Sequence, residues 1–475
     1  MASSSPSPSP STYLVVGAGC FGASTARALK RTHPDAEVVL ADPAPPPDER
    51  AAAHDFNKIV RAEYDDPLYM GLALEALAAW SPDAGSQPDS ADVVAPFFRR
   101  TGALWSITRE RTRALVANYE AFLGAGNAPL EALSLDDARR RFPALEACQF
   151  PGGGAEPWGG SPEQCVLSPR AGWADAQGAL GAVIQEAERA GVRYEVATVA
   201  KLTFAFGSGS GGDVDAGDGK AARCTGAVTT DGRRLAAKNV VLCAGAYVPW
   251  LLADSAPDRP ALHAGDRMRA AAVLMALFRV PPGPEGLAKF EGAPVIVHPF
   301  GEYPSESIPP GSPHGPELAK CTHEFPYTHN RYHEGARQEI SVPPLTTNPA
   351  LMMWTRDLLP DALRANSAAV RDLLFGDAVQ GMTPEAYRLC WDLSTPDEEW
   401  IISPHPAAGS LYVATGGSFH AFKFLPIIGK YVVQMIEGTL PEEYARRWAW
   451  DRKITPIRTP YMPRGDLSDV PGYPE

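Results

Sequence analysis

Hydrophobic and polar positions alternate in a strand-and-helix pattern at the start of the chain. Residues 12–17, TYLVVG, form a short apolar run that is rich in β-branched residues and ends at glycine, which is typical of a buried strand. Residues 22–33, GASTARALKRTH, predict a helix, and residues 36–42, AEVVLAD, predict a second strand. Together they predict one β-α-β unit, the unit from which parallel sheets are built.

Similar patterns return later in the chain. Residues 172–191 predict a helix, and residues 224–247 predict a hairpin that turns at Asp231-Gly232 and is followed by a buried strand. Strands alternate with proline-rich loops over residues 270–344, and residues 348–375 predict a helical stretch. The chain therefore mixes α and β elements throughout, without internal repeats.

The loop between the first predicted strand and helix, GAGCFG, carries the first chemical signal. Gly17 permits a tight turn, Gly19 lets the backbone approach a pyrophosphate, and Gly22 allows close packing of helix on strand. Asp42 ends the next strand about 20 residues later, where an acid accepts hydrogen bonds from a ribose. The pattern predicts a dinucleotide site, and Cys20 and Phe21 of the same loop are counted among its cofactor-binding residues, with Cys20 as a small packing residue rather than a nucleophile.

Two further strand ends point to FAD. The strand at residues 239–243 runs into Ala244 and Gly245, where backbone can again lie against a dinucleotide. A later strand ends in Gly416-Gly417 and leads through a loop to a helix, whose N-terminus suits the pyrimidine end of a flavin. Together with the first loop, this pattern is typical of FAD proteins rather than of NAD dehydrogenases.

These elements predict an α/β (α+β) fold with an FAD-binding, Rossmann-like domain built from discontinuous segments and an inserted, sheet-rich substrate domain. Residues 1–11, a polar Pro/Ser stretch, are predicted to be a disordered tail. The remaining chain is divided into 12–85, 160–260 and 376–475 for the FAD-binding domain, and 86–159 and 261–375 for the substrate domain.

Composition narrows the class of protein. The net charge of −13 argues against a nucleic-acid partner, because phosphate binding needs a basic face. Seven scattered cysteines argue against a disulfide framework and fit a reducing compartment. The tail lacks the apolar core of a signal peptide, the longest apolar run (Ala270–Phe278) is too short to span a bilayer, and the last residues are not Ser-Lys-Leu. We expect a cytoplasmic protein without membrane or metal sites.

Five stretches carry a resemblance to a known family. They read VVGAGCFGASTA, DFNKIVRAEYDDPLY, GWADAQGAL, YRLCWDLSTPDEEWIISPHP and GGSFHAFKFLPIIGKYV. Together they resemble the D-amino-acid-oxidase-type FAD-dependent oxidoreductases. Within that superfamily they resemble the branch of monomeric sarcosine oxidase, the pipecolate and saccharopine oxidases, and the fungal fructosyl amino acid oxidases (amadoriases).

The resemblance implies a covalent flavin. Family members attach FAD through a cysteine thioether to the 8α-methyl group, and Cys390 matches that cysteine in its spacing to the strand IISPHP and to the later glycine loop. A thiolate adds readily to an electrophilic carbon. The alternative is a buried structural cysteine.

The resemblance also assigns residues to substrate and oxygen. Arg61 matches the family arginine that pairs with the substrate carboxylate, and Lys423 matches a second cation at the same carboxylate. Lys320 matches the lysine above the flavin that promotes the reaction with oxygen by an electrostatic effect. For the flavin itself, the resemblance adds a set of contacts from His54, Lys58, Val199, Gly416, Gly417, Phe419, His420 and Lys423.

The substrate is less clearly indicated. Glu324, in KCTHEFP, is similar to an amadoriase glutamate that contacts the sugar part of a fructosyl amino acid. Against this, RRWAWDRK at residues 446–453 resembles the pipecolate and saccharopine oxidases, and the amadoriase pattern has a basic residue where this chain has Ala449. We therefore expect an N-alkylated or cyclic secondary amino acid, with a fructosyl amino acid as the alternative.

The sequence predicts an FAD-dependent amine oxidase. It would oxidise a C–N bond to an imine and reduce O2 to H2O2, acting as a monomer whose partners are a small amino-acid-like substrate and oxygen. Two alternatives stay open: a flavin dehydrogenase that uses another electron acceptor, and a flavin-binding protein without turnover.

Overall fold

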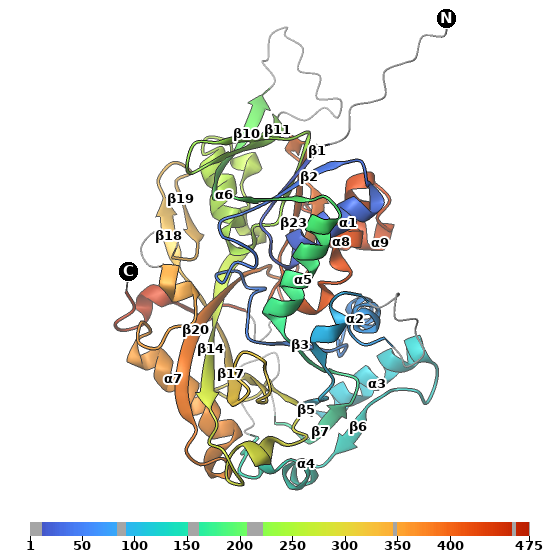
Figure 1. Ribbon diagram of the computed structural model, residues 1–475, viewed down its shortest axis with the longest axis vertical. Helices are drawn as coiled ribbons and strands as arrows, with labels where there is room; N and C mark the ends of the chain where they lie inside the picture. The colour runs from blue at the N-terminus through green and yellow to red at the C-terminus, as the bar shows by residue number, and fades with distance from the viewer. Residues whose placement is uncertain are drawn as a thin grey trace, which may run out of the picture.

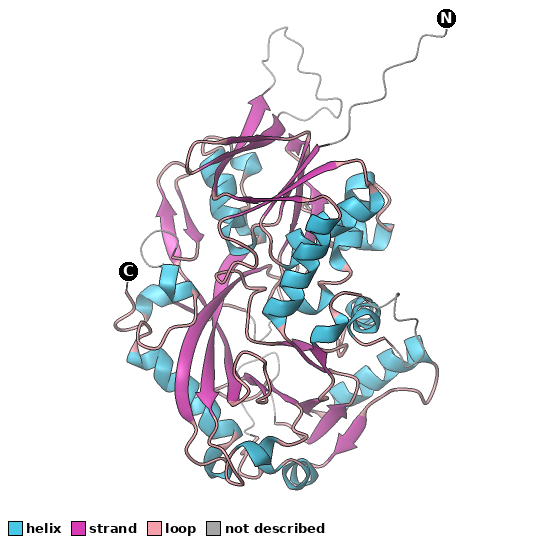
Figure 2. Cartoon of the chain, in the orientation of Figure 1, coloured by secondary structure: helices cyan, strands magenta, loops and turns pink. Residues whose placement is uncertain are grey.

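The protein is described by a computed structural model that covers residues 12–82, 92–150, 161–206, 222–344, 349–457 and 462–474. The predicted tail, residues 1–11, lies outside these ranges. Two large sheets dominate the fold, one in the upper half of Figure 1 and one in the lower half, and Figure 2 shows helices on the outside of both.

The first sheet has six strands in the order β21-β23-β13-β1-β2-β9. All neighbours are parallel except β21, which runs antiparallel to β23. The strands are β1 (Thr12–Val16), β2 (Glu37–Asp42), β9 (Arg193–Val196), β13 (Asn239–Leu242), β21 (Ile401–Pro404) and β23 (Leu411–Thr415). As the glycine pattern predicts, β1, α1 (Cys20–Thr32) and β2 form the first β-α-β unit.

Side-chain alternation along β1 shows how this sheet is covered. Tyr13 and Val15 pack with α1, α5 (Ala176–Arg189) and α8 (Ile428–Glu437), which lie side by side in Figure 1. Leu14 and Val16 face the opposite side and pack against a smaller sheet and helix α6 (Val248–Ser255). That smaller sheet contains β10 (Val199–Phe206), β11 (Ala222–Thr229), β12 (Arg234–Ala236) and β22 (Ala408–Gly409). The β11–β12 pair is the predicted hairpin.

The second sheet has nine strands, in the order β20-β14-β17-β16-β15-β5-β7-β6 with β24 beside β17. Most of its neighbours are antiparallel. The strands are β5 (Ala103–Ile107), β6 (Glu131–Leu133), β7 (Gln164–Ser168), β14 (Arg269–Arg279), β15 (Val295–His298), β16 (Ser305–Ile308), β17 (Leu318–Thr328), β20 (Thr383–Ser394) and β24 (Gly465–Asp466).

The two faces of this second sheet have different roles. Leu274 on β14 and Leu389 on β20 belong to a core that includes helix α7 (Asp361–Leu374). Their neighbours Val273 and Cys390 point to the other face, where a cavity lies. Because side chains alternate along a strand, one face of each strand supports the fold and the other is left for the site.

The remaining elements connect these layers. A three-stranded sheet contains β3 (Lys58–Val60), β4 (Phe98–Arg99) and β8 (Gly172–Ala174). A hairpin contains β18 (Asn330–His333) and β19 (Gln338–Ser341). Further helices are α2 (Pro67–Trp80), α3 (Arg109–Leu123), α4 (Leu135–Arg141) and α9 (Glu442–Arg447).

The sheet pairing differs from the expected division of the chain for three strands. Strands β7, β20 and β24 fall in segments that the sequence assigned to the FAD-binding domain, but all three pair within the nine-stranded sheet. The sequence of a strand does not tell which sheet the strand joins. In addition, residues 353–360 of the predicted helical stretch are not helical, and α7 begins only after Pro360.

Candidate active site

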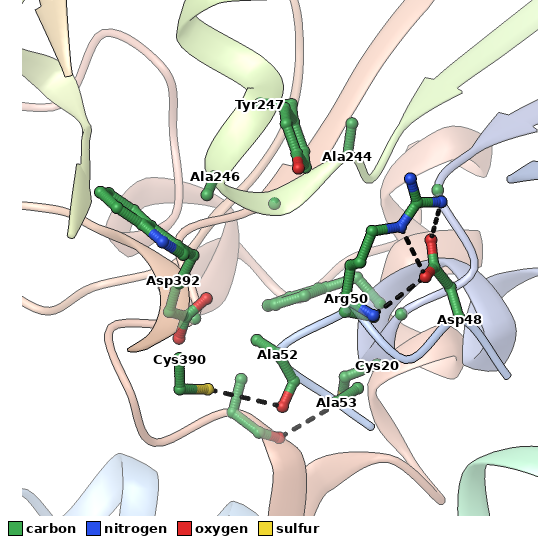
Figure 3. A pocket seen from close by; sticks show the side chains of 18 of the residues that line it. Cys20, Asp48, Arg50, Ala52, Ala53, Ala244, Ala246, Tyr247, Cys390 and Asp392 are labelled. Atoms are coloured by element: carbon green, nitrogen blue, oxygen red, sulfur yellow. Dashed lines mark hydrogen bonds and ion pairs between the residues drawn. The ribbon is translucent and has the colours of Figure 1, made fainter. Parts of the chain in front are cut away.

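A cavity of about 750 Å³ lies where the two large sheets approach each other. One side comes from the carboxyl ends of β1, β2 and β13, and the other from the inner face of β14, β16, β17 and β20. Figure 3 shows its central part, in which Cys390 points toward Ala52 while Arg50 and Asp48 lie across from Tyr247. Parallel-sheet proteins commonly bind ligands at the carboxyl ends of their strands.

The glycine turn between β1 and α1 forms one end of the cavity. Gly17 has a φ of +98°, and a Cβ there would lie 2.6 Å from the carbonyl oxygen of Cys243. A Cβ on Gly22 would lie 1.7 Å from the carbonyl oxygen of Gly17. Above Gly19, by contrast, a Cβ would meet no atom within 4 Å. The turn is packed tightly below and open above, as a pyrophosphate cradle requires.

Asp42, at the end of β2, closes this turn from the side. Its Oδ2 accepts a hydrogen bond of 2.7 Å from the backbone N–H of Ala18, while its buried Oδ1 has no partner among the described residues. Burial raises the pKa of Asp42 to about 7. A ribose hydroxyl would supply the missing donor. Val199, Ala244 and Gly245 line the same end of the cavity.

Cys390 lies on β20 with its side chain at the cavity surface. It is buried, pairs across the sheet with Val273 and has its Sγ 4.0 Å from the carbonyl oxygen of Ala52 (Figure 3). Lys58 lies on the opposite side. Burial lowers the pKa of Lys58, but the electrostatic effects of Cys390 and Asp55 outweigh burial and hold that pKa above its ordinary value. The thiol therefore has a charged ammonium group as its neighbour.

The loop after β23 forms a further part of the cavity. Two consecutive residues, Ser418 and Phe419, have positive φ angles of 47° and 62°. Asp392 on β20 holds this strained turn by accepting a hydrogen bond of 2.8 Å from the backbone N–H of Phe419. His420 follows, and burial and the Lys423 charge lower its pKa to about 3. Its imidazole is therefore neutral at physiological pH.

Lys320 is held by an acid that the sequence analysis did not identify. Its Nζ donates to Asp55 Oδ2 at 2.8 Å and to the carbonyl oxygen of Asn57. Lys58 Nζ lies 3.2 Å from the same Asp55 oxygen. Burial raises the pKa of Asp55, but Lys320 and then Lys58 outweigh burial and keep it well below its ordinary value. Asp55 is therefore a buried carboxylate shared by two lysines.

Arg61 and Lys423 place two more buried cations on the same cavity. Arg61 donates to the carbonyl oxygen of Glu63 and lies over the rings of Tyr64 and Trp105, at 4.9 and 4.6 Å. Lys423 Nζ donates to the hydroxyl of Tyr64 at 2.9 Å and to the carbonyl oxygen of His420 at 2.7 Å.

Burial also lowers the pKa of Lys320, although the Asp55 carboxylate opposes that effect. Burial, and then the Arg61 charge, lower the pKa of Lys423 well below its ordinary value. An anion bound here would reverse that effect.

Family and structural relatives agree with this geometry. A family model described as FAD dependent oxidoreductase (DAO) matches residues 12–435. The chain belongs to this family. L-saccharopine oxidase of Schizosaccharomyces pombe is 28% identical over 453 residues, which cover 92% of this chain and 93% of the relative. Amino acid oxidase imqH of Aspergillus flavus is 26% identical, with 90% and 93% covered.

Solved structures give the same result for the fold. The fructosyl peptide oxidase from E. terrenum superimposes with a TM-score of 0.76 at 26% identity, covering 98% of each chain. The predicted family, the α/β fold class and the assignment as an FAD-dependent oxidoreductase are therefore confirmed. The oxidase and amadoriase alternatives for the substrate both remain compatible with these relatives.

The residues of this FAD-dependent oxidoreductase fit the cofactor. The open space above Gly19, the unpartnered Oδ1 of Asp42 and the backbone at Gly245 lie along one side of a single cavity that continues to Cys390. The space above Gly19 suits a pyrophosphate, Oδ1 of Asp42 suits a ribose hydroxyl, and the backbone at Gly245 suits the approach to an isoalloxazine ring.

Most of the predicted site residues line this cavity, but three do not. Gly22 packs beneath the turn, and a Cβ on Gly416 would meet Thr395 rather than the cavity. His54 lies beside a second, more open cavity, and only its carbonyl oxygen turns inward, accepting 2.5 Å from Arg388 Nη1. The predicted flavin contact of the His54 side chain is therefore not supported by its position, because His54 lines the second cavity and not the one that carries Cys390.

The structure adds site residues that sequence reasoning missed. Asp55 is the first residue of the stretch DFNKIVR, so its position close to Lys58 and Arg61 in the sequence could have marked it as a site residue. Arg50 forms a fork on Asp48, with Nε to Oδ1 at 2.9 Å and Nη2 to Oδ2 at 2.8 Å, and it had no motif to mark it (Figure 3). Glu306 joins the cavity from β16, again without a motif.

Among the described residues, no helix combines the length and apolar character needed to cross a bilayer. The predicted cytoplasmic location and monomeric state stay predictions.

Proposed function

We propose that the protein is an amine oxidase for a secondary amino acid, N-alkylated or cyclic, with oxygen as the electron acceptor. The observation that carries the proposal is the position of Arg61 and Lys423 in the same cavity as the dinucleotide turn. A cavity with two buried cations favours an anionic ligand group, and the planar fork of an arginine suits a carboxylate.

The chain's own residues then have separate tasks. Arg61 and Lys423 bind and orient the carboxylate, and Lys320, fixed by Asp55, holds a positive charge at the oxygen side. These residues would hold the amine next to FAD, which, when bound, would supply the hydride acceptor and the electron transfer to oxygen. The cavity between the sheets holds the amine against it, away from bulk water.

We also propose that Cys390 holds FAD through a thioether to its 8α-carbon. The support is the position of Cys390 at the cavity surface, together with the resemblance of its segment. Protein precipitated with acid should stay yellow, and Cys390→Ala should release its flavin into the supernatant. A colourless wild-type pellet would contradict the linkage while leaving the oxidase proposal intact.

A fructosyl amino acid is the second candidate substrate. It is supported by Glu324, which lines the cavity where a sugar could donate hydrogen bonds. Peroxide formation should be measured in air with sarcosine, L-pipecolate, saccharopine, N-methyl aromatic amino acids and fructosyl amino acids.

A rate with one of the first four compounds supports the main proposal, and a rate only with the fructosyl compounds supports the alternative. Reduction of the flavin without peroxide would indicate a dehydrogenase. No reduction by any compound would contradict both proposals.

A further inference from the structure

Two glutamates face the cavity from neighbouring strands. Lys320, Thr322 and Glu324 alternate along β17, so their side chains point to the same face. Glu306 on β16 pairs with Thr322, which makes it a diagonal neighbour of Glu324. Diagonal neighbours in a sheet lie about 7–8 Å apart, within reach of two long side chains.

One carboxyl oxygen of this pair lacks a hydrogen-bond donor among the described residues. Glu324 is 6% exposed and lines the cavity, yet its buried Oε2 has no partner among the described residues. Unsatisfied buried polar atoms are rare and call for an explanation. A ligand in the cavity that carries N–H groups would supply the missing donor.

The charges around the pair are mostly positive. Burial, and then the neighbouring Glu306, raise the pKa of Glu324 well above its ordinary value, which favours the protonated form of Glu324. The groups that face the pair are Lys320 on β17, Lys58 on β3, Arg61 after it and Lys423 from the loop after β23, with Glu63 and Tyr64 behind them.

An amino acid enters such a cavity as a zwitterion, with one carboxylate and one ammonium group. Arg61 and Lys423 match the carboxylate. A secondary ammonium has two N–H groups, and the cavity offers two carboxyl groups, one of which has an oxygen without a donor among the described residues. Oxidation at carbon requires the neutral amine, because its lone pair must be available as the hydride leaves.

We propose that Glu306 and Glu324 form an acidic subsite that binds the secondary ammonium of the substrate and takes its proton before oxidation. The N–H bond breaks, its electron pair stays on nitrogen, and the proton moves to the Glu306 carboxylate and later to solvent. The remaining N–H donates to the carbonyl oxygen of Glu324. This inference rests on the proposed function and adds a residue, Glu306, to it.

The first test uses two small ligands that share a carboxylate. N,N-dimethylglycine carries an ammonium group, and (methylthio)acetate has a neutral sulfur in its place. Their dissociation constants can be measured from the change in the visible spectrum of the flavin in the FAD-loaded protein. Glu306→Gln should weaken the ammonium ligand about 10- to 100-fold, as expected for the loss of a hydrogen bond to a charged group, and leave (methylthio)acetate almost unchanged.

Glu63→Gln is the matched control. Glu63 is buried beside the same cations but is not part of the cavity surface, and its Oε1 accepts 2.6 Å from the hydroxyl of Tyr119. It should not change the ratio of the two dissociation constants. Equal weakening of both ligands in Glu306→Gln, or no weakening of either, would overturn the proposal.

The second readout is the pH profile of anaerobic flavin reduction by whichever of sarcosine and L-pipecolate reduces the wild-type flavin. In Glu306→Gln, the ratio of the reduction rate constant to the substrate dissociation constant should rise about tenfold per pH unit up to the pKa of the ammonium. The wild type should show a flatter profile. Identical profiles would overturn proton transfer to Glu306.

The two proposals fail in different ways. If (methylthio)acetate does not bind the wild type, the carboxylate site of the proposed function is wrong, and the ammonium subsite falls with it. If it binds and the wild type does not distinguish the two ligands, only the ammonium subsite is wrong.

Discussion

The two buried lysines of the cavity, Lys320 and Lys423, are satisfied in different ways. Lys320 donates to the Asp55 carboxylate and to a carbonyl oxygen. Lys423 donates to the hydroxyl of Tyr64 and a carbonyl oxygen, and its nearest strong charge effect is the repulsion from Arg61. The first lysine is hydrogen-bonded to a carboxylate, whereas for the second the charges of Glu306 and Glu63 do not offset burial and the Arg61 charge.

We call Lys320 the fixed cation, because a protein carboxylate favours its charge. We call Lys423 the receptive cation, because a bound ligand would favour its charge. A cation that stabilises developing charge on oxygen has to be charged before oxygen arrives, and Asp55 favours that charge against the burial that lowers the pKa of Lys320. A cation that binds substrate does better if its charge is stabilised only in the complex, because the ligand then contributes the missing interaction. The following predictions test each half of this comparison.

The largest effect is expected from Asp55→Asn. Removing this carboxylate leaves the buried Lys320 and the half-buried Lys58 without their shared partner, which costs about 3–5 kcal/mol in comparable cases. The free energy of unfolding, measured by urea titration of the FAD-loaded protein, should fall by that amount. Asp65→Asn, which breaks the more exposed pair with Arg111, should change it by about 1 kcal/mol or less.

The sign of the pH dependence follows from the depressed pKa of Asp55. Its contribution to stability is fully present above its unfolded pKa of about 3.9 and is lost as the pH falls below that value. A variant within 1 kcal/mol of the wild type at neutral pH would mean that Asp55 is not the anchor of the two lysines.

Lys320→Met should act on oxygen rather than on substrate. Loss of one preorganised group that stabilises developing charge typically slows a reaction by about 10²–10³-fold. Stopped-flow mixing of reduced enzyme with oxygen should show a decrease of that order, while anaerobic reduction by substrate changes far less. Lys58→Met keeps the Lys320–Asp55 pair and should slow reoxidation less. Reoxidation at the wild-type rate in Lys320→Met would refute the assignment.

Arg61→Ala should weaken carboxylate binding at least about tenfold, because each hydrogen bond to a charged group is worth about 1.5–3 kcal/mol. Arg61→Lys keeps the charge without the fork and should be intermediate. The double change with Lys423→Met should be less than additive, since both cations serve one ligand group.

The control for the Arg61 series is a substrate whose carboxylate is converted to an amide. The wild type should discriminate strongly against it, and Arg61→Ala should not. Equal oxidation of acid and amide by the wild type would mean that Arg61 does not bind a carboxylate.

The sequence was most informative where function depends on local backbone geometry. The turn at Gly17 is set by residues within one β-α-β unit, so its pattern can be read directly. Arg61, Lys320 and Lys423 were placed only through the family resemblance, yet all three line one cavity.

The partners of these residues were the part that could not be predicted. Asp55 meets Lys320 across 265 positions of the chain, and Glu306 meets Glu324 only through the register of β16 and β17. Neither the pairing of distant strands nor the choice of sheet for β20 leaves a periodic signal, because both are decided by tertiary packing.

The smallest effect concerns Lys423 and is seen in ligand binding rather than in the rate. In the free cavity, burial and the Arg61 charge hold the pKa of Lys423 well below its ordinary value of 10.5. A bound carboxylate favours the charged amine, so binding takes up a proton. Affinity for (methylthio)acetate should therefore fall as the pH rises toward 10.5, by no more than tenfold per pH unit for one proton.

Variants of Lys423, Arg61 and Lys320 test whether Lys423 is the group that causes this pH dependence. Lys423→Met should remove the pH dependence, and Arg61→Ala should move it to higher pH, because the second-largest cause of the lowered pKa is then gone. Lys320→Met should leave it unchanged, since Lys320 keeps its charge through Asp55 and not through the ligand. A pH dependence that persists in Lys423→Met and disappears in Lys320→Met would reverse the comparison and make Lys320 the receptive cation.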